Sequence, residues 1–367
     1  MFRFENLHQV ELEITNRCQA SCPMCARNIH GGIDNPSLKI SDWTLEDFTT
    51  IFDKETVKNV ESFWFCGSFG DPIINNDFLD MCKYVKQENP KAQFVAHTNG
   101  SFRNPQWWKE LAEAMPTNHR IFFALDGIDH ATHILHRQGT FFDKVIENAK
   151  SFIEGGGVAV WNFIRFKHNE LQVEQARQMS KELGFKDFSL KDTRRFDVIP
   201  YKVIDSKGHT THLLEPGSTN KNGAVNMTHI EKSRDNWSSS KDIYCYAKEG
   251  RNVYIDAHKT VLPCCIKASF MYMDYDKELF SKYGLYDPTT STNDEAKQIQ
   301  KQVFEILEEF GGIEALDARK GLKNIINSKA WQTIWTSKWE TNGSKACSLM
   351  CSKASPYIEM GEQFVDK

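Results

Sequence analysis

Three cysteines lie close together near the amino end of the chain. Cys18, Cys22 and Cys25 are spaced CxxxCxxC within the stretch NRCQASCPMCAR. Thiolates bind soft or borderline metals, so zinc and an iron–sulfur cluster compete for such a set. Structural zinc sites use four protein ligands, and no fourth cysteine or histidine stands at ligand spacing here. Three thiolates on a four-iron cluster would leave one iron free to bind another molecule. The set therefore favours an iron–sulfur cluster over a zinc ion.

A second set of cysteines follows in the carboxyl third. Cys245, Cys264, Cys347 and Cys351 supply four more thiolates, and Cys265 is a spare neighbour. Four thiolates suit a second iron–sulfur cluster or a zinc ion. Adjacent side chains diverge, so we expect only one member of the Cys264–Cys265 pair to be a ligand.

The elements that position the first set are read from the hydrophobic pattern. Short apolar runs rich in β-branched and aromatic residues alternate with helical patterns up to about residue 195, which is typical of repeated strand–helix units. The predicted strands are 10–15, 62–67, 93–98, 121–126, 158–164 and 187–192. The predicted helices between them are 44–55, 77–88, 105–115, 141–156 and 170–184, and Thr44 with Asp47 forms a possible capping pair for the first.

Six such units predict an α/β fold, a partial (β/α)6 barrel related to the TIM barrel, with its site at the carboxyl ends of the strands. A catalytic base, if the reaction needs one, should project from this edge. The candidates that the predicted strands place there are Asp126, Lys191, Asp192 and Arg194. Each of them could equally anchor a substrate or form a structural ion pair.

Composition divides the chain into three parts. We expect the barrel over residues 1–199, a polar linker or flap over 200–242, and a cysteine-bearing domain over 243–367. The middle part is rich in Gly, Ser, Asn, Thr and Lys, which is too polar to build a core. The last part opens with a plausible β-hairpin and contains an amphipathic helical pattern over 294–310.

The overall composition excludes several classes of protein. The chain has 45 basic and 49 acidic residues, so its net charge of −4 predicts no general binding of nucleic acid. No apolar run reaches the roughly 20 residues that span a membrane. The first residues do not resemble a signal peptide, so we expect a cytoplasmic protein whose cysteines are not disulfides.

The motifs resemble those of the radical S-adenosylmethionine (SAM) enzymes. NRCQASCPMCAR, following a strand, is similar to the loop whose three cysteines hold a [4Fe-4S] cluster, with the free iron bound by the methionine part of SAM. FWFCGSFGDP resembles the family's glycine-rich turn, which implies that Gly67, Gly70 and Asp71 hold the methionine amino group. AHTNGS resembles the segment near the ribose, which implies Thr98 and Asn99. Met24 stands where an aromatic residue is common and would pack on the adenine.

The carboxyl third resembles the auxiliary-cluster region called SPASM, or its shorter form called twitch. The resemblance implies a second [4Fe-4S] cluster on Cys245, Cys264, Cys347 and Cys351, with Cys264 rather than Cys265 as the second ligand. Only four well-placed cysteines follow the barrel, which favours the single cluster of the twitch form.

The resemblance implies reductive cleavage of SAM to a 5′-deoxyadenosyl radical, which abstracts a hydrogen from a peptide or small-molecule substrate. The auxiliary cluster would accept an electron during an oxidation or cross-linking. The alternatives are a redox-neutral enzyme with a structural auxiliary cluster, or a non-catalytic iron–sulfur scaffold or electron carrier. An external one-electron donor such as flavodoxin or ferredoxin is implied as a partner.

Overall fold

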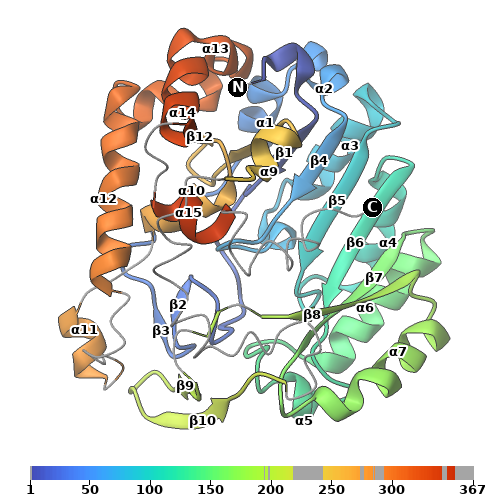
Figure 1. Cartoon of the computed structure of the whole chain (residues 1–367). Helices are drawn as coiled ribbons and strands as arrows, with labels where there is room; N and C mark the ends of the chain where they lie inside the picture. Colours follow the sequence, from blue (N-terminus) through green and yellow to red (C-terminus); the bar gives the residue numbers. More distant parts are fainter. Residues whose placement is uncertain are drawn as a thin grey trace.

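A predominantly parallel sheet forms the centre of the molecule (Figure 1). The computed structural model describes residues 2–193, 195–196, 199–217, 243–272, 277–283, 285, 293–340 and 345–351. Six strands of the sheet are parallel and follow one another in chain order: β1 (Gln9–Leu12), β4 (Ser62–Phe65), β5 (Gln93–Thr98), β6 (Asn118–Ala124), β7 (Ala159–Arg165) and β8 (Asp187–Asp192). The predicted partial (β/α)6 barrel is confirmed.

Helices connect the parallel strands, and Figure 1 shows α3, α4, α6 and α7 side by side along one face of the sheet. The predicted helix over 44–55 is two helices, because Asp53 caps a second one through the Thr56 N–H. The connecting elements are α1 (Leu45–Ile51), α2 (Lys54–Asn59), η2 (Pro72–Ile74), α3 (Phe78–Glu88), α4 (Pro105–Ala114), α5 (His130–His133), α6 (Phe142–Glu154), η3 (Glu170–Gln172) and α7 (Val173–Glu182).

Alternation along the strands separates the two faces of the sheet. On β1, Val10 and Leu12 join the large core beneath the helices, so the intervening Glu11 points to the opposite, concave face. On β4, Phe63 belongs to the helix side, whereas Trp64 packs on a separate small cluster. The concave face is therefore partly polar, as a binding site requires.

The predicted carboxyl-terminal hairpin joins the same sheet. β11 (Asn252–Ile255) pairs in parallel with β1, and β12 (Val261–Leu262) continues antiparallel at the edge. The barrel sheet and the start of the carboxyl third thus share one set of hydrogen bonds. The remaining elements are η1 (Phe4–Asn6), α9 (Tyr246–Glu249), α10 (Cys265–Tyr272), α11 (Lys277–Lys282), α12 (Asn293–Glu309), η4 (Ile313–Leu316), η5 (Ala318–Lys320), α13 (Leu322–Asn327), α14 (Lys329–Glu340) and α15 (Lys345–Cys351).

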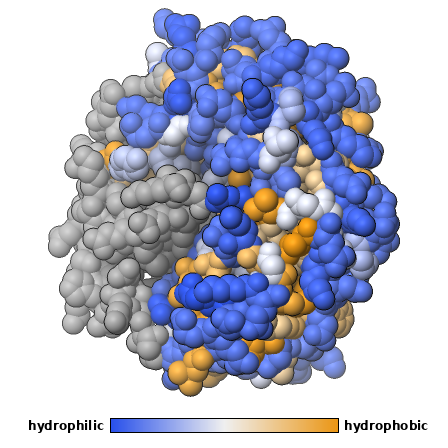
Figure 2. Space-filling view, turned by 90° about the vertical axis from the view of Figure 1, so that its right-hand side faces the viewer, coloured by the Kyte–Doolittle hydropathy of each residue, from blue (hydrophilic) through white to orange (hydrophobic). Residues whose placement is uncertain are grey.

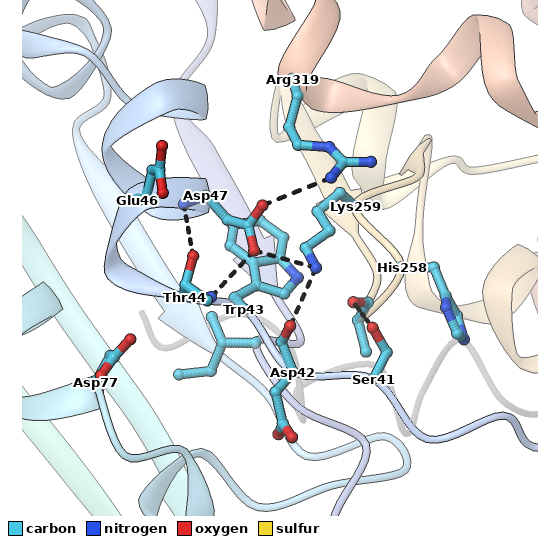
Figure 3. Close-up of polar contacts among 12 residues, drawn as sticks. Ser41, Asp42, Trp43, Thr44, Glu46, Asp47, Asp77, His258, Lys259 and Arg319 are labelled. Carbon is cyan, nitrogen blue, oxygen red and sulfur yellow. Dashed lines mark hydrogen bonds and ion pairs between the residues drawn. The ribbon is translucent and has the colours of Figure 1, made fainter.

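The turn of this hairpin is bound to the start of α1 (Figure 3). Lys259 Nζ lies 3.2 Å from Asp47 Oδ2 and donates to the Asp42 carbonyl at 3.0 Å. Arg319 reaches the other oxygen of Asp47 at 3.7 Å. Asp47 also completes the predicted capping box with Thr44, so one carboxylate starts a barrel helix and fixes the carboxyl-terminal region to it.

Two short antiparallel pairs lie below the sheet in Figure 1. β2 (Asn28–Ile29) pairs with β3 (Ile33–Asp34), and β9 (Tyr201–Ile204) pairs with β10 (Thr210–Leu214). Within the predicted polar linker or flap over 200–242, residues 201–214 form a hairpin, because Tyr201, Val203 and Leu214 pack into a small core. Most of the remainder of that segment, 218–242, lies outside the described residues.

Among the helices that the structure describes, none combines the length and the apolar content needed to cross a bilayer. The face shown in Figure 2 is mainly hydrophilic, with smaller hydrophobic patches.

Candidate functional site

The three amino-terminal cysteines lie in the loop between β1 and β2, at the carboxyl edge of the sheet. All three are partly buried free thiols. Burial raises the pKa of Cys22 to about 11, and the neighbouring Cys25 raises it further while Arg137 opposes the shift. Burial also raises the pKa of Cys18, and both Cys22 and Cys25 add to this. The thiols are therefore close enough to repel one another once ionised.

The glycine-rich turn after β4 is held by a carboxylate that directly follows β1. Glu13 Oε1 accepts hydrogen bonds from the Phe69 N–H at 2.5 Å and the Gly70 N–H at 2.8 Å, and the Tyr254 hydroxyl donates to its other oxygen. A Cβ at Gly70 would lie 2.0 Å from the Thr15 carbonyl oxygen, so only glycine fits this close approach. Glu13 and Gly70 together place Asp71.

Asp71 closes the turn that follows β5. Its Oδ2 accepts from the Thr98 hydroxyl at 3.1 Å, from the Asn99 N–H at 2.7 Å and from Asn99 Nδ2 at 2.6 Å. Burial raises the pKa of Asp71 to about 6, and these hydrogen bonds oppose the rise. Asn99 Nδ2 also lies 3.5 Å from Cys18 Sγ, and Gln19 Nε2 donates to Asn99 Oδ1 at 2.7 Å. The structure thus brings Asp71, Thr98 and Asn99 together beside the first cysteine loop.

Asp126 lies at the end of β6, within a network of buried charges. Its Oδ2 accepts from Arg137 Nε at 2.5 Å and pairs with His136 Nδ1 at 2.8 Å, while Oδ1 accepts from the Ile164 N–H at 2.7 Å. Burial alone would raise its pKa, but Arg137 and His136 hold the pKa of Asp126 well below its usual range. The Arg137 guanidinium also bonds to the Cys22 thiol. Asp126 therefore links this strand end to the cysteine loop.

The predicted residues of β8 lie in two different environments. Lys191 Nζ stands 5.6 Å from the centre of the Phe122 ring. Asp192 forms a two-point pair with Arg165, at 3.0 and 2.8 Å. Arg194 lies outside the described residues. Asp192 is therefore engaged with the neighbouring strand, and Lys191 is the one that faces the concave side, above an aromatic ring.

Rings from three adjacent strands stack on that concave side. His97 lies between Trp64 and Phe122, with ring centres 5.7 and 4.5 Å away and planes within 7° and 11° of parallel. Burial lowers the pKa of His97 to about 3, and Lys191 lowers it further, so the imidazole is neutral. The stack gives the barrel interior an apolar wall.

Met24 is placed in a small core below the cysteine loop. It is buried with Phe166, Phe196, Tyr201 and other members of the β9–β10 hairpin core. The Tyr201 hydroxyl donates to the Pro23 carbonyl at 2.8 Å, which fixes the hairpin to the loop. The Met24 thioether is thus packed against protein side chains.

The four carboxyl-terminal cysteines converge on one small, apolar cavity. Its lining includes Cys245, Cys264, Cys347 and Cys351. Burial raises the pKa of Cys264 well above its usual range, and the other three thiols each raise it further. Cys264 directly precedes α10, and the Lys267 N–H of that helix opposes the shift by favouring the thiolate. Three separate chain segments therefore contribute four thiols to the lining of one cavity.

Cys265 points away from this cavity. Its Sγ lies 3.4 Å from the Tyr246 hydroxyl and contacts the carboxylate of Glu11 on β1. The two neighbouring side chains diverge, with Cys264 lining the cavity and Cys265 on the barrel side. No group of three His, Cys, Asp or Glu side chains in the described part of the chain is arranged around a single metal ion.

Sequence reasoning missed Glu13 and Arg137. Glu13 carries one available signal, a carboxylate that alternates with the apolar residues Leu12 and Ile14 in the predicted strand 10–15. Arg137 had none, because its partners Asp126 and Cys22 come from other loops.

Comparison with known proteins identifies the barrel. Residues 12–180 match the family model described as the Radical SAM superfamily. The chain is 25% identical over 144 residues to a 7,8-dihydro-6-hydroxymethylpterin dimethyltransferase of Methanocaldococcus jannaschii, covering 38% of this chain and 27% of that protein. It is 29% identical over 129 residues to a tungsten-containing aldehyde ferredoxin oxidoreductase cofactor-modifying protein of Pyrococcus furiosus, covering 34% and 32%. The matches thus span about a third or less of these relatives.

A solved structure shares the fold over nearly the whole chain. The structure described as native anSMEcpe with bound AdoMet superimposes with a TM-score of 0.51 at 13% identity, covering 97% of this chain and 95% of that one. At this identity the likeness concerns the fold alone. The family match covers β4 to β7, the cysteine loop and the Asp71 turn described above, so residues 12–180 form a radical SAM domain.

Proposed function

We propose that this protein is a radical SAM enzyme that cleaves SAM reductively and abstracts a hydrogen atom from its substrate. Cys18, Cys22 and Cys25 would hold a [4Fe-4S] cluster. When bound and reduced, this cluster supplies the electron that yields the 5′-deoxyadenosyl radical. The observation that carries the proposal is the convergence of three partly buried thiols on the carboxyl edge of a radical SAM domain. A [4Fe-4S] cluster is larger than a single metal ion, so its cysteine ligands lie farther apart than the ligands of a zinc ion.

The Asp71 turn is the proposed binding site for the methionine part of SAM. Gly67 and Gly70 let the backbone approach closely, and Asp71 with Thr98 and Asn99 offers a carboxylate and amides beside Cys18. A buried carboxylate of this kind favours an ammonium group, such as that of the methionine moiety. Glu13 would position this turn without touching the cofactor.

The cavity of four cysteines is the proposed site of a second [4Fe-4S] cluster. The supporting observations are its four thiols and its apolar lining, which match what such a cluster requires. Four protein ligands would saturate its irons, which favours electron transfer over direct substrate binding. We therefore assign it the role of electron acceptor in an oxidation or cross-linking.

Roles follow for the residues at the strand ends. We assign Asp126 to positioning Arg137 against Cys22, since its oxygens are already engaged and its pKa is low. Asp192 is assigned a structural pairing with Arg165. Lys191 and the ring stack beneath it form the proposed substrate wall. A peptide or a small molecule is the proposed substrate, and a flavodoxin or ferredoxin the proposed electron donor.

The test is anaerobic reconstitution with iron and sulfide, followed by iron analysis and electron paramagnetic resonance after reduction. We expect about eight irons per chain, as two four-iron clusters. Replacing Cys18, Cys22 and Cys25 by Ala should leave about four, and replacing Cys245, Cys264, Cys347 and Cys351 should leave the other four. Stoichiometric zinc, or iron that survives either set of replacements unchanged, would refute the assignment.

A further inference from the structure

A buried carboxylate lies on the boundary between the barrel and the second cysteine cavity. Glu11, on the central strand β1, is 5% exposed and faces the concave side of the sheet. Its carboxylate accepts hydrogen bonds from the Cys265 thiol and the Gln9 side chain. Neither partner is a cation, so the charge of an ionised Glu11 is not neutralised by these contacts.

Two contacts connect Glu11 to the cavity. Cys265 follows Cys264, whose thiol lines the cavity, and Cys265 Sγ touches the hydroxyl of Tyr246, which lines it too. Glu13, which directly follows β1, is engaged differently, because its oxygens accept hydrogen bonds from the Tyr254 hydroxyl and two backbone amides. Of these two buried glutamates, Glu11 is the one that is linked to the cavity lining, through Cys265 and the Tyr246 hydroxyl that Cys265 touches.

We propose that Glu11 is the proton acceptor that works with the second cysteine site. The inference rests on the proposed function, in which an iron–sulfur cluster in that cavity takes one electron from the substrate radical. Glu11 takes the proton of the C–H, N–H or O–H bond next to the radical centre. The two electrons of that bond and the unpaired electron then provide one new π bond and the one electron that leaves, so the product is neutral and closed-shell.

Reduction of the cluster and protonation of Glu11 favour each other electrostatically. An electron added near Cys264 raises the proton affinity of a carboxylate close by, because like charges in a medium of low dielectric constant repel strongly. Burial already raises the pKa of Glu11 to about 7, so a small further rise is enough for proton uptake near neutral pH. The other titratable groups around it are Glu13 just after β1, Cys66 after β4, Tyr246 on α9 and Cys265 on α10.

The test measures the reduction potential of the second site against pH, without substrate. The full chain with Cys18, Cys22 and Cys25 replaced by Ala is reconstituted with iron and sulfide and titrated between pH 6 and pH 8.5. If Glu11 takes up a proton on reduction, the reduction equilibrium changes by up to tenfold per pH unit, which is about 59 mV for one electron. Glu11→Gln in this background should give a potential independent of pH, and the matched variant Glu13→Gln should keep the slope.

A slope that survives Glu11→Gln, or one that is lost in Glu13→Gln instead, would overturn the proposal. Infrared difference spectra of the parent on reduction provide a second readout, which does not depend on whether Glu11→Gln folds. The parent should gain a protonated carboxyl band, and its absence would also overturn the proposal. A parent that binds no iron at all would refute the proposed function itself, whereas bound iron with a flat potential would refute only the role of Glu11.

Discussion

Arg137 Nε lies 2.5 Å from Asp126 Oδ2, and the same guanidinium bonds to the thiol of Cys22. A carboxylate at the end of β6 thereby sets the position of a cation against the cysteine loop that follows β1. Asp126 was predicted as a possible base, a substrate anchor or a member of a structural ion pair, and its observed contacts are those of an ion pair. The pair forms because Arg137 and His136, eleven and ten residues away, turn back onto it.

We predict that Asp126→Asn destabilises the protein strongly. Removing one member of a buried ion pair leaves Arg137 unpaired and typically costs about 3–5 kcal/mol in the free energy of unfolding. Since the pKa of Asp126 is lowered in the folded state, its contribution is present above the unfolded value of about 3.9 and is lost on acidification below it. Urea unfolding at pH 7 measures the loss.

Asp192→Asn is the matched control for this prediction. The Arg165–Asp192 pair has similar geometry, but its carboxylate side chain is 23% exposed, whereas that of Asp126 is fully buried. Asp192→Asn should therefore lower the free energy of unfolding clearly less than Asp126→Asn does. Equal losses in the two variants would show that burial of the Asp126 pair is not what matters.

We also predict that Asp71→Ala weakens SAM binding by about tenfold or more without reducing the iron content, because a charge-assisted hydrogen bond contributes roughly 1.5–3 kcal/mol. Equilibrium binding to the reconstituted protein gives the affinity. Asp53→Ala, which removes a helix cap on α2 away from the turn, should bind SAM normally. Wild-type affinity in Asp71→Ala would show that this turn is not the SAM site.

The neighbouring cysteines give a direct comparison. In the background without Cys18, Cys22 and Cys25, Cys264→Ala should lower the iron content from about four per chain to near zero, whereas Cys265→Ala should retain it. The reason is that, of these two neighbours, only Cys264 lines the cavity. The reverse result, or retention in both variants, would contradict the assignment of the ligands.

Glu11 should make stability depend on pH. Its pKa is raised from 4.5 to about 7, so the folded state loses stability as pH rises through this window. Between pH 5.5 and pH 8 the destabilisation from this one group should grow by about 2 kcal/mol. Glu11→Gln removes it, so the difference in unfolding free energy between variant and wild type should rise by this amount. A difference that does not vary with pH would contradict a raised pKa.

Much of the barrel was predictable because its strands are marked by local patterns. The six predicted strands all overlap observed ones, and the cysteine loop and the Asp71 turn lie at their carboxyl ends as parallel topology requires. The predicted hairpin at the start of the carboxyl third is also observed. Each of these features depends on residues close together in the sequence.

The remaining features depend on contacts between distant residues. That β11 pairs with β1 cannot be read from either strand, and it is this pairing that lets Tyr254 reach Glu13 across 241 positions. The choice between Cys264 and Cys265 depends on which way α10 begins. The hairpin over 201–214 was hidden by its polar composition, since only every second residue of β9 enters its small core.

The most direct test of the account is an anaerobic assay of SAM cleavage. Reduced, reconstituted protein should convert SAM to 5′-deoxyadenosine and methionine, detected by chromatography and mass spectrometry, even before the substrate is known. The variant with Cys18, Cys22 and Cys25 replaced by Ala should form none, while it still binds iron at the second site. Wild-type protein that binds iron at both sites and forms no 5′-deoxyadenosine, or a triple variant that forms as much as wild type, would contradict the proposed function.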